Sequence, residues 1–362
     1  MKKMKAFIAA VMAAAMSLSM AACGSSSSSS TAASGSAAST AAASGEAQYA
    51  VVLKVLSSQF WQSMRDGIQA EADKLGVKVD IYAANTEDDV EGQVSLLENA
   101  ISKGTYKAIG VAPISDVNLN NAIADATSKG IKIVDIDEKI NMDALSKLGG
   151  SCYAYVATDN KAVGKMGAEN LIKQIGGSGE VAIVEGKAGA VSGENRRDGA
   201  KAAFEAAGLK IVESQPADWD RTKAYDVATN YITAHPDLKA IYCCNDTMAM
   251  GVQEAVEASG KNVKVCGTDG NDDAIQSVAD GKLAATVAQD PASVGAKGLD
   301  LLAEAVQKDA KPQVGAEVPV YSIDAILITK DNASQYLKKE DDFLRSIANG
   351  ASARNCSRRC ER

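Results

Sequence analysis

Short apolar runs alternate with longer amphipathic segments along most of the chain from Ala50 onward. In the first half, the apolar runs predict strands at 50–53, 77–82, 108–111 and 131–136. The segments between them have helical spacing and predict helices at 60–75, 90–104 and 119–130. Because nearly continuous Val/Ile runs are typical of parallel strands buried on both faces, the pattern predicts an α/β fold with doubly wound parallel sheets.

The second half of this pattern repeats the first at a constant spacing of 132 residues. The matching segments are Arg65-Asp66-Gly67 with Arg197-Asp198-Gly199, Gly76 with Gly208, Lys107-Ala108-Ile109 with Lys239-Ala240-Ile241, and Asp137 with Asp269. Both aspartates stand at the end of a predicted strand. We therefore expect two similar lobes, with the ligand site in the gap between them.

The loops that follow the predicted strands hold the candidate binding residues, because ligands of open α/β sheets bind outside the carboxyl ends of the strands. Aromatic residues are only 4% of the chain, yet Phe60, Trp61 and Trp219 fall in these loops together with carboxylates, an amide, arginines and a lysine. Apolar ring faces and forked polar groups suit a sugar ring. The alternative interpretation makes Trp219 a core residue, and Asp137 and Asp269 helix N-caps.

The first 22 residues have the features of an export signal. Residues 1–5 carry three lysines, and residues 6–16 are an apolar run too short to cross a bilayer as a mature helix. Met20-Ala21-Ala22-Cys23 resembles a bacterial lipobox, which implies acylation of Cys23. The alternative is ordinary cleavage near Ala22, which leaves Cys23 as a free thiol. Either way, we expect the protein to be exported.

Composition divides the rest of the chain. Residues 24–45 contain only Gly, Ser, Thr and Ala, so a flexible tether is expected at 23–46, between the lipidated cysteine and the folded body. We expect the lobes to comprise 47–157 plus 290–318 and 158–289 plus 319–337. The charged segment 338–362 is expected to be a disordered tail.

Charge and residue types exclude several functions. The net charge of −8 counts against a nucleic-acid partner. His235 is the only histidine, and no nucleophile–base pair is evident, so we expect no enzyme, no metal site and no cofactor. Cys152 and Cys266 stand in apolar contexts that predict buried thiols. A disulfide from Cys243 or Cys244 to Cys266 is an open alternative.

Long motifs carry a family resemblance. They are Tyr49–Lys54, Asp137–Asp143, Ser214–Arg221, Ala240–Gly251 and Thr286–Gln289. These segments resemble the ribose/galactose/allose group of type I periplasmic binding proteins, and the similarity runs from about residue 48 to 329. The resemblance implies two lobes joined by three strands at a hinge. These lobes close over one monosaccharide, D-allose or a related hexose, for the permease and ATPase of an ABC importer.

The resemblance also implies the contact residues. Hydrogen bonds to the sugar are expected from Lys54, Asp137, Glu138, Arg196, Asn245, Asp269 and Gln289. Phe60, Trp61 and Trp219 are expected to sandwich its ring. Ser58 completes the set, although Ser58-Gln59 replaces the Asn-Pro pair that the family usually has before its aromatic residues. This replacement removes one amide contact and one fixed φ angle.

We also expect a monomer that contacts the membrane only through the lipid anchor at Cys23. We expect it at the outer face of the cytoplasmic membrane or in the periplasm. An alternative function is a sensory receptor that presents a sugar or autoinducer-type ligand to a chemoreceptor or sensor kinase. Ribose and galactose are alternative ligands.

Overall fold

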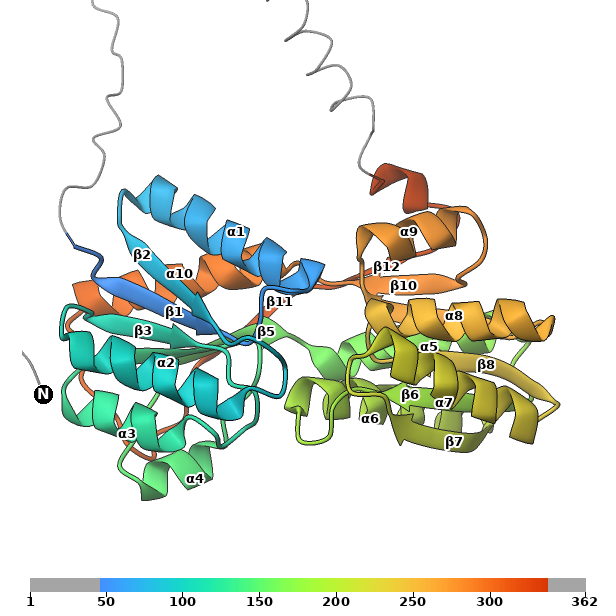
Figure 1. Ribbon diagram of the computed structural model, residues 1–362, viewed down its shortest axis with the longest axis horizontal. Coiled ribbons are helices and arrows are strands. Elements are labelled where there is room, and N and C mark those ends of the chain that lie inside the picture. Colours follow the sequence, from blue (N-terminus) through green and yellow to red (C-terminus); the bar gives the residue numbers. More distant parts are fainter. Residues whose placement is uncertain (1–45, 338–362) are drawn as a thin grey trace, which may run out of the picture. The chain divides into compact units, whose positions relative to one another are not determined.

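The computed structural model describes residues 46–337, which form two α/β lobes (Figure 1). The expected export signal, Cys23, most of the tether and the C-terminal tail lie outside these described residues. Among residues 46–337, no helix combines the length and the apolar character that a membrane crossing requires. The folded body is thus the two lobes.

The first lobe contains a six-stranded parallel sheet in the order β11-β5-β4-β3-β1-β2. Its strands are β1 (Tyr49–Leu53), β2 (Val79–Ala83), β3 (Ala108–Val111), β4 (Lys132–Ile136), β5 (Ala154–Thr158) and β11 (Val320–Ile323). The helices that pack on it are α1 (Gln59–Leu75), α2 (Val90–Lys103), α3 (Asn120–Ser128) and α10 (Pro291–Gln307), and the short helix α4 (Met142–Lys147) packs on α3. Every residue of β1 and β3 is buried, which explains their apolar sequences.

The second lobe repeats this arrangement with the strand order β12-β10-β9-β8-β6-β7. Its strands are β6 (Glu180–Glu185), β7 (Lys210–Pro216), β8 (Leu238–Cys243), β9 (Lys264–Asp269), β10 (Ala285–Ala288) and the antiparallel edge strand β12 (Ile326–Ile328). Its helices are α5 (Asn160–Gln174), α6 (Val191–Ala206), α7 (Arg221–Ala234), α8 (Asp246–Ser259) and α9 (Asp272–Ala279), followed by a short 3₁₀ turn (Ala333–Gln335). The predicted doubly wound fold with two similar lobes is confirmed.

The chain crosses between the lobes three times, after β5, after β10 and after β11. The last crossing lies later than we expected. We assigned residues 319–337 to the second lobe, but β11 pairs in parallel with β5 of the first sheet, with Val320 opposite Tyr155. This backbone ladder keeps β11 in the first lobe, so the crossing lies between Ile323 and Ile326.

The repeated Arg-Asp-Gly motif marks helix contacts that need glycine. A Cβ atom on Gly67 of α1 would lie 2.1 Å from the Ala292 carbonyl oxygen of α10. A Cβ atom on Gly199 of α6 would likewise lie 2.1 Å from the Lys161 carbonyl oxygen of α5. In each lobe, a helix that begins at the carboxyl edge of the sheet therefore packs in backbone contact against a helix that follows a crossing.

The four cysteines within residues 46–337, at 152, 243, 244 and 266, are buried free thiols. The predicted buried thiols at Cys152 and Cys266 are confirmed, and the alternative of a disulfide to Cys266 is wrong. Burial in apolar surroundings raises the pKa of all four thiols, so they remain protonated at neutral pH.

Candidate binding site

A cavity of about 520 Å³ is lined by residues of both lobes at the carboxyl ends of the strands. All predicted contact residues line it except Glu138 and Gln289, and each of these two contacts a residue that does. The lining members of the predicted set are Lys54, Ser58, Phe60, Trp61, Asp137, Arg196, Trp219, Asn245 and Asp269. The sequence pattern and the resemblance thus selected residues that the fold brings together.

An ion pair forms part of the first-lobe wall. Lys54 Nζ lies 2.6 Å from Glu138 Oε2. Glu138 is fully buried. Its carboxylate also accepts two hydrogen bonds from Ser192 of the second lobe, one from the backbone N–H (2.7 Å) and one from the side-chain hydroxyl (2.8 Å). Burial by itself lowers the pKa of Lys54, but the negative charges of Glu138, Glu87 and Asp137 and the hydrogen bond to Glu138 together outweigh burial, so the pKa is raised. Lys54 therefore lines the cavity with a charged ammonium group whose position is fixed by Glu138.

Asp137 is an acceptor without a partner. Its side chain is 3% exposed, and its Oδ1 has no hydrogen-bond partner in the described part of the chain. Burial raises its pKa to about 7, against the lowering effect of Lys54. Its backbone has φ of 65°, the left-handed region that a non-glycine residue adopts only under constraint. A hydroxyl group of a ligand would satisfy this oxygen.

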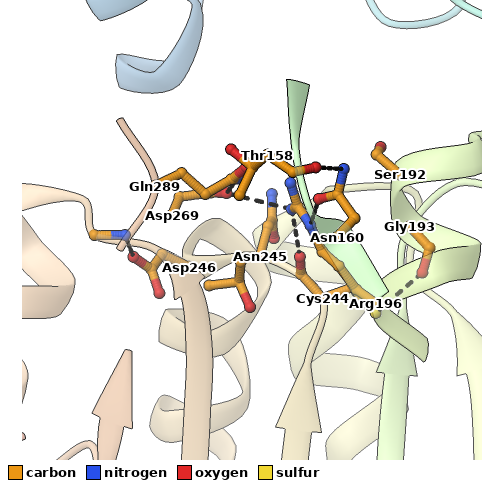
Figure 2. Close-up of polar contacts among 12 residues, drawn as sticks. Thr158, Asn160, Ser192, Gly193, Arg196, Cys244, Asn245, Asp246, Asp269 and Gln289 are labelled. Carbon is orange, nitrogen blue, oxygen red and sulfur yellow. Dashed lines mark hydrogen bonds and ion pairs between the residues drawn. The ribbon is translucent and has the colours of Figure 1, made fainter. Parts of the chain in front are cut away.

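Arg196 and Asp269 form part of the second-lobe wall (Figure 2). Arg196 Nε donates to Asn160 Oδ1 at 2.7 Å, and Nη1 donates to the Cys244 carbonyl oxygen at 2.8 Å and to Asp269 Oδ1 at 3.3 Å. Gln289 Nε2 also donates to Asp269 Oδ1, at 2.7 Å. Burial raises the pKa of Asp269 to about 6, and the Arg196 charge limits that rise.

Aromatic rings from both lobes reach the cavity. Phe60 and Trp61, at the start of α1, pack edge to face with their ring centroids 5.1 Å apart. Trp219 comes from the loop between β7 and α7, where its φ is 63°. Lys54 Nζ lies 5.8 Å from the Trp61 ring centroid, and Arg196 Cζ lies 5.9 Å from the Trp219 ring centroid. Each lobe thus contributes an indole ring with a cation beside it.

The alternative interpretation of these residues is only partly right. Trp219 is half-buried and packs against the second-lobe core, but it also lines the cavity. Asp137 and Asp269 cap none of the described helices; the cap positions nearest to them are occupied by Asn141 for α4 and Asn271 for α9. The residue that does cap a helix is Asn245, whose side chain accepts from Met248 N at 2.8 Å and so fixes the start of α8.

The cavity also has lining residues that the sequence analysis did not name as ligand contacts: Val55, Ser57, Gln59, Glu87, Ser192, Thr247 and Asn271–Asp273. Glu87 is the most informative, because its Oε1 accepts from the indole Nε1 of Trp61 at 3.2 Å. It follows the predicted strand at 77–82, so the rule about carboxyl ends of strands already pointed to its loop.

Several contacts join the lobes directly around the cavity. Gln59 Oε1 accepts from the backbone N–H of Asp272 at 3.1 Å. Lys187 Nζ donates to the Glu87 carbonyl oxygen at 2.7 Å and pairs with the Asp88 carboxylate. Gln59 occupies the position of the family's usual proline, so this departure supplies a contact between the lobes.

Comparisons with known proteins agree with this geometry. The family model described as periplasmic binding protein domain matches residues 49–310. The chain is 52% identical over 289 residues to the D-allose-binding periplasmic protein of Escherichia coli K12, covering 78% of this chain and 92% of that protein. It is 33% identical over 282 residues to the ribose import binding protein of the same organism, covering 78% and 90%.

Solved structures give the same relationship. One is the periplasmic solute binding protein of an ABC transporter from Actinobacillus succinogenes 130z, solved with bound D-allose. It superposes with a TM-score of 0.74 at 35% sequence identity, and the match covers 80% of this chain and all of that one. A carbohydrate transporter solute binding protein from Agrobacterium radiobacter, solved with D-arabinose, has a TM-score of 0.70 at 32% identity and covers 80% and 97%.

Proposed function

The chain belongs to the periplasmic binding protein family, and from this premise we propose that it captures D-allose or a related hexose and delivers it to an ABC importer. The observation that carries the proposal is the meeting of Trp61, Asp137, Arg196, Trp219 and Asp269 from two lobes on one cavity. The Escherichia coli relative that is 52% identical to this chain is a D-allose-binding protein, and the Actinobacillus succinogenes relative was solved with bound D-allose.

The wall chemistry supports a polyhydroxylated ring as the ligand. Asp137 and Asp269 offer carboxylate oxygens to sugar hydroxyl groups, while Lys54 and Arg196 offer N–H donors. The indole of Trp61 and that of Trp219 would stack on the apolar C–H faces of the ring. Glu138 and Gln289 act from behind the lining: Glu138 holds Lys54, and Gln289 holds Asp269.

Capture follows from the division of the site between the lobes. A ligand shifts a protein toward a conformation only as far as it binds that conformation better. Lys54, Asp137 and Trp61 belong to the first lobe, whereas Arg196 and Trp219 belong to the second. Because neither lobe alone offers the full set, a sugar gains its full contacts only when the lobes meet, and it stabilises that state.

A fluorescence titration tests the proposal. The chain has only two tryptophans, and both line the cavity, so selectively excited tryptophan fluorescence reports on this site. D-allose, ribose, galactose, glucose, xylose and myo-inositol would be titrated separately, with a thermal-shift measurement for each. We expect saturable quenching or enhancement and the largest rise in Tm with D-allose. A protein that responds to none of these sugars contradicts the proposal.

The N-terminal segment leads us to a further proposal on location. We propose that the protein is an exported monomer and is acylated at Cys23, so that the lobes stay at the outer face of the cytoplasmic membrane and have no catalytic activity of their own. Metabolic labelling with a fatty acid should mark the wild type but not Cys23→Ser. Equal labelling of both would overturn the anchor and leave the sugar-binding proposal intact.

A further inference from the structure

The first crossing between the lobes ends at Asn160, the first residue of α5. Its amide oxygen accepts from Arg196 Nε at 2.7 Å, and its amide nitrogen donates to the Thr158 carbonyl oxygen at 3.2 Å (Figure 2). Asn160 is 5% exposed and is not part of the cavity lining. It therefore joins the crossing to a cavity residue without facing the cavity itself.

The guanidinium group of Arg196 has five N–H donors in a fixed plane. Nε is held by Asn160, and Nη1 is held by the Cys244 carbonyl oxygen and Asp269. Figure 2 shows Asn160 and Asp269 on opposite sides of the arginine side chain. Within residues 46–337, Nη2 makes no hydrogen bond, so its donors are the ones left for a ligand. The contacts at Nε and Nη1 determine where Nη2 points.

We propose that Asn160 is a positioning residue for the ligand: it orients the Arg196 guanidinium from the hinge and so makes ligand affinity depend on the geometry of the crossing. The inference rests on the proposed sugar-binding function and extends it to a residue outside the cavity. Gln289, at the second crossing, holds Asp269 in the same way. Each member of the Arg196–Asp269 pair is thus held by an amide side chain from a different crossing.

The packing of α5 on α6 makes this link stiff. A Cβ atom on Gly164 would lie 1.9 Å from the Arg196 carbonyl oxygen, so the two helices touch through their backbones beside Arg196. The Arg196 backbone therefore moves with α5, and its side chain is tied to the end of the crossing through Asn160. A rotation of the crossing changes the direction of Nη2 rather than being absorbed by a flexible side chain.

Substitution of Asn160 tests the proposal. A hydrogen bond to a charged group is worth enough for Asn160→Ala to raise the sugar Kd roughly ten- to a hundredfold in the fluorescence titration. Asn160→Asp keeps an acceptor for Nε and should recover most of the affinity. Asn170→Ala is the matched control, because Asn170 lies on the same helix but contacts Gln174. It should bind as the wild type does.

A second measurement separates positioning from general damage. The Tm of the unliganded protein should be nearly equal for Asn160→Ala and the wild type, and small-angle scattering at saturating sugar should show weaker compaction for the variant. If the alanine variant does not fold, Asn160→Ser, whose hydroxyl is too short to reach Nε, must bind more weakly than Asn160→Asp.

The outcomes are distinguishable. A wild type that binds sugar and an Asn160→Ala variant that binds it equally well overturn this inference alone. The same holds if alanine and aspartate at position 160 weaken binding equally. A wild type that binds none of the sugars overturns the proposed function and this inference with it.

Discussion

Lys54 Nζ and Glu138 Oε2 lie 2.6 Å apart, and the two side chains are only 4% and 0% exposed. Because Ser192 of the second lobe donates twice to the same carboxylate, an ion pair of the first lobe reaches across to the other lobe. A charge buried this deeply needs its partner, since removal of one member of a buried pair leaves the other uncompensated.

Lys54→Met should therefore destabilise the protein by about 3–5 kcal/mol, measured as the free energy of unfolding in urea. The double variant Lys54→Met/Glu138→Gln, which removes the stranded charge, should regain part of this loss. A double variant that is no more stable than the single one would mean that the loss comes from packing instead.

Asp137 should make stability depend on pH. Its pKa rises from 3.8 to about 7 on folding, because burial, Glu138 and Asp269 disfavour its charge more than Lys54 and Arg196 favour it. Between about pH 4 and pH 7 the native state binds more protons than the unfolded chain does, so the free energy of unfolding falls as the pH rises. The loss is on the order of 4 kcal/mol when complete.

Asp137→Asn removes this titration. The variant should differ little from the wild type in urea unfolding near pH 4 and should be progressively more stable than the wild type from pH 5 to pH 8, while binding sugar more weakly. If the difference in unfolding free energy between the variant and the wild type stays constant over this range, Asp137 is ionised throughout.

Trp219→Ala should weaken sugar binding at least roughly tenfold, because it removes one stacking face. The Tm of the unliganded protein should change little, and Trp61 remains as the fluorescent reporter. Gly186→Ala is the companion variant: its new Cβ atom would lie 2.1 Å from Cη2 of Trp219, so the indole must move. A collapse of unliganded stability in Trp219→Ala would make this tryptophan mainly a core residue.

Lys187→Met should weaken the meeting of the lobes. The lost contacts to Glu87 and Asp88 lie near the surface, so the sugar Kd should rise only roughly two- to fivefold, with faster dissociation in stopped-flow measurements. Lys201→Met is the control, since Lys201 lies on the same lobe and pairs only within α6, with Glu205. Equal dissociation rates for both variants would contradict a role of Lys187 in closure.

Local patterns were sufficient for much of the fold and the cavity lining. The predicted strand at 131–136 is β4, and the predicted helix at 60–75 is α1. Residues such as Asp137 and Asp269 could be selected because parallel strands bring their carboxyl ends to one edge of a sheet. The 132-residue repeat then predicted a second sheet with an edge of the same kind, and this repeat is visible in the sequence alone.

Other features depend on contacts that no local pattern encodes. Val320–Ile323 is a short edge strand of partly exposed residues, so its sequence does not indicate which sheet it joins. Asn160 reads only as the start of a helix; its role depends on a contact with Arg196, 36 residues away, that exists because α5 and α6 touch. Glu87 lies in a loop at the carboxyl end of a predicted strand, where the sequence can suggest binding residues. Its hydrogen bond to Trp61, however, depends on how that loop folds.

The backbone contact between Gly67 and Ala292 has a consequence for how the chain assembles. Residues 160–288 hold five helices and five strands of the second lobe in one continuous stretch, and of its sheet only the edge strand β12 comes later in the chain. The first lobe cannot be completed until α10 and β11, beyond residue 290, have emerged and reached α1 and β5. Both lobes therefore need residues beyond 290 for completion: the first lobe needs a helix and an edge strand, whereas the second needs only the edge strand β12.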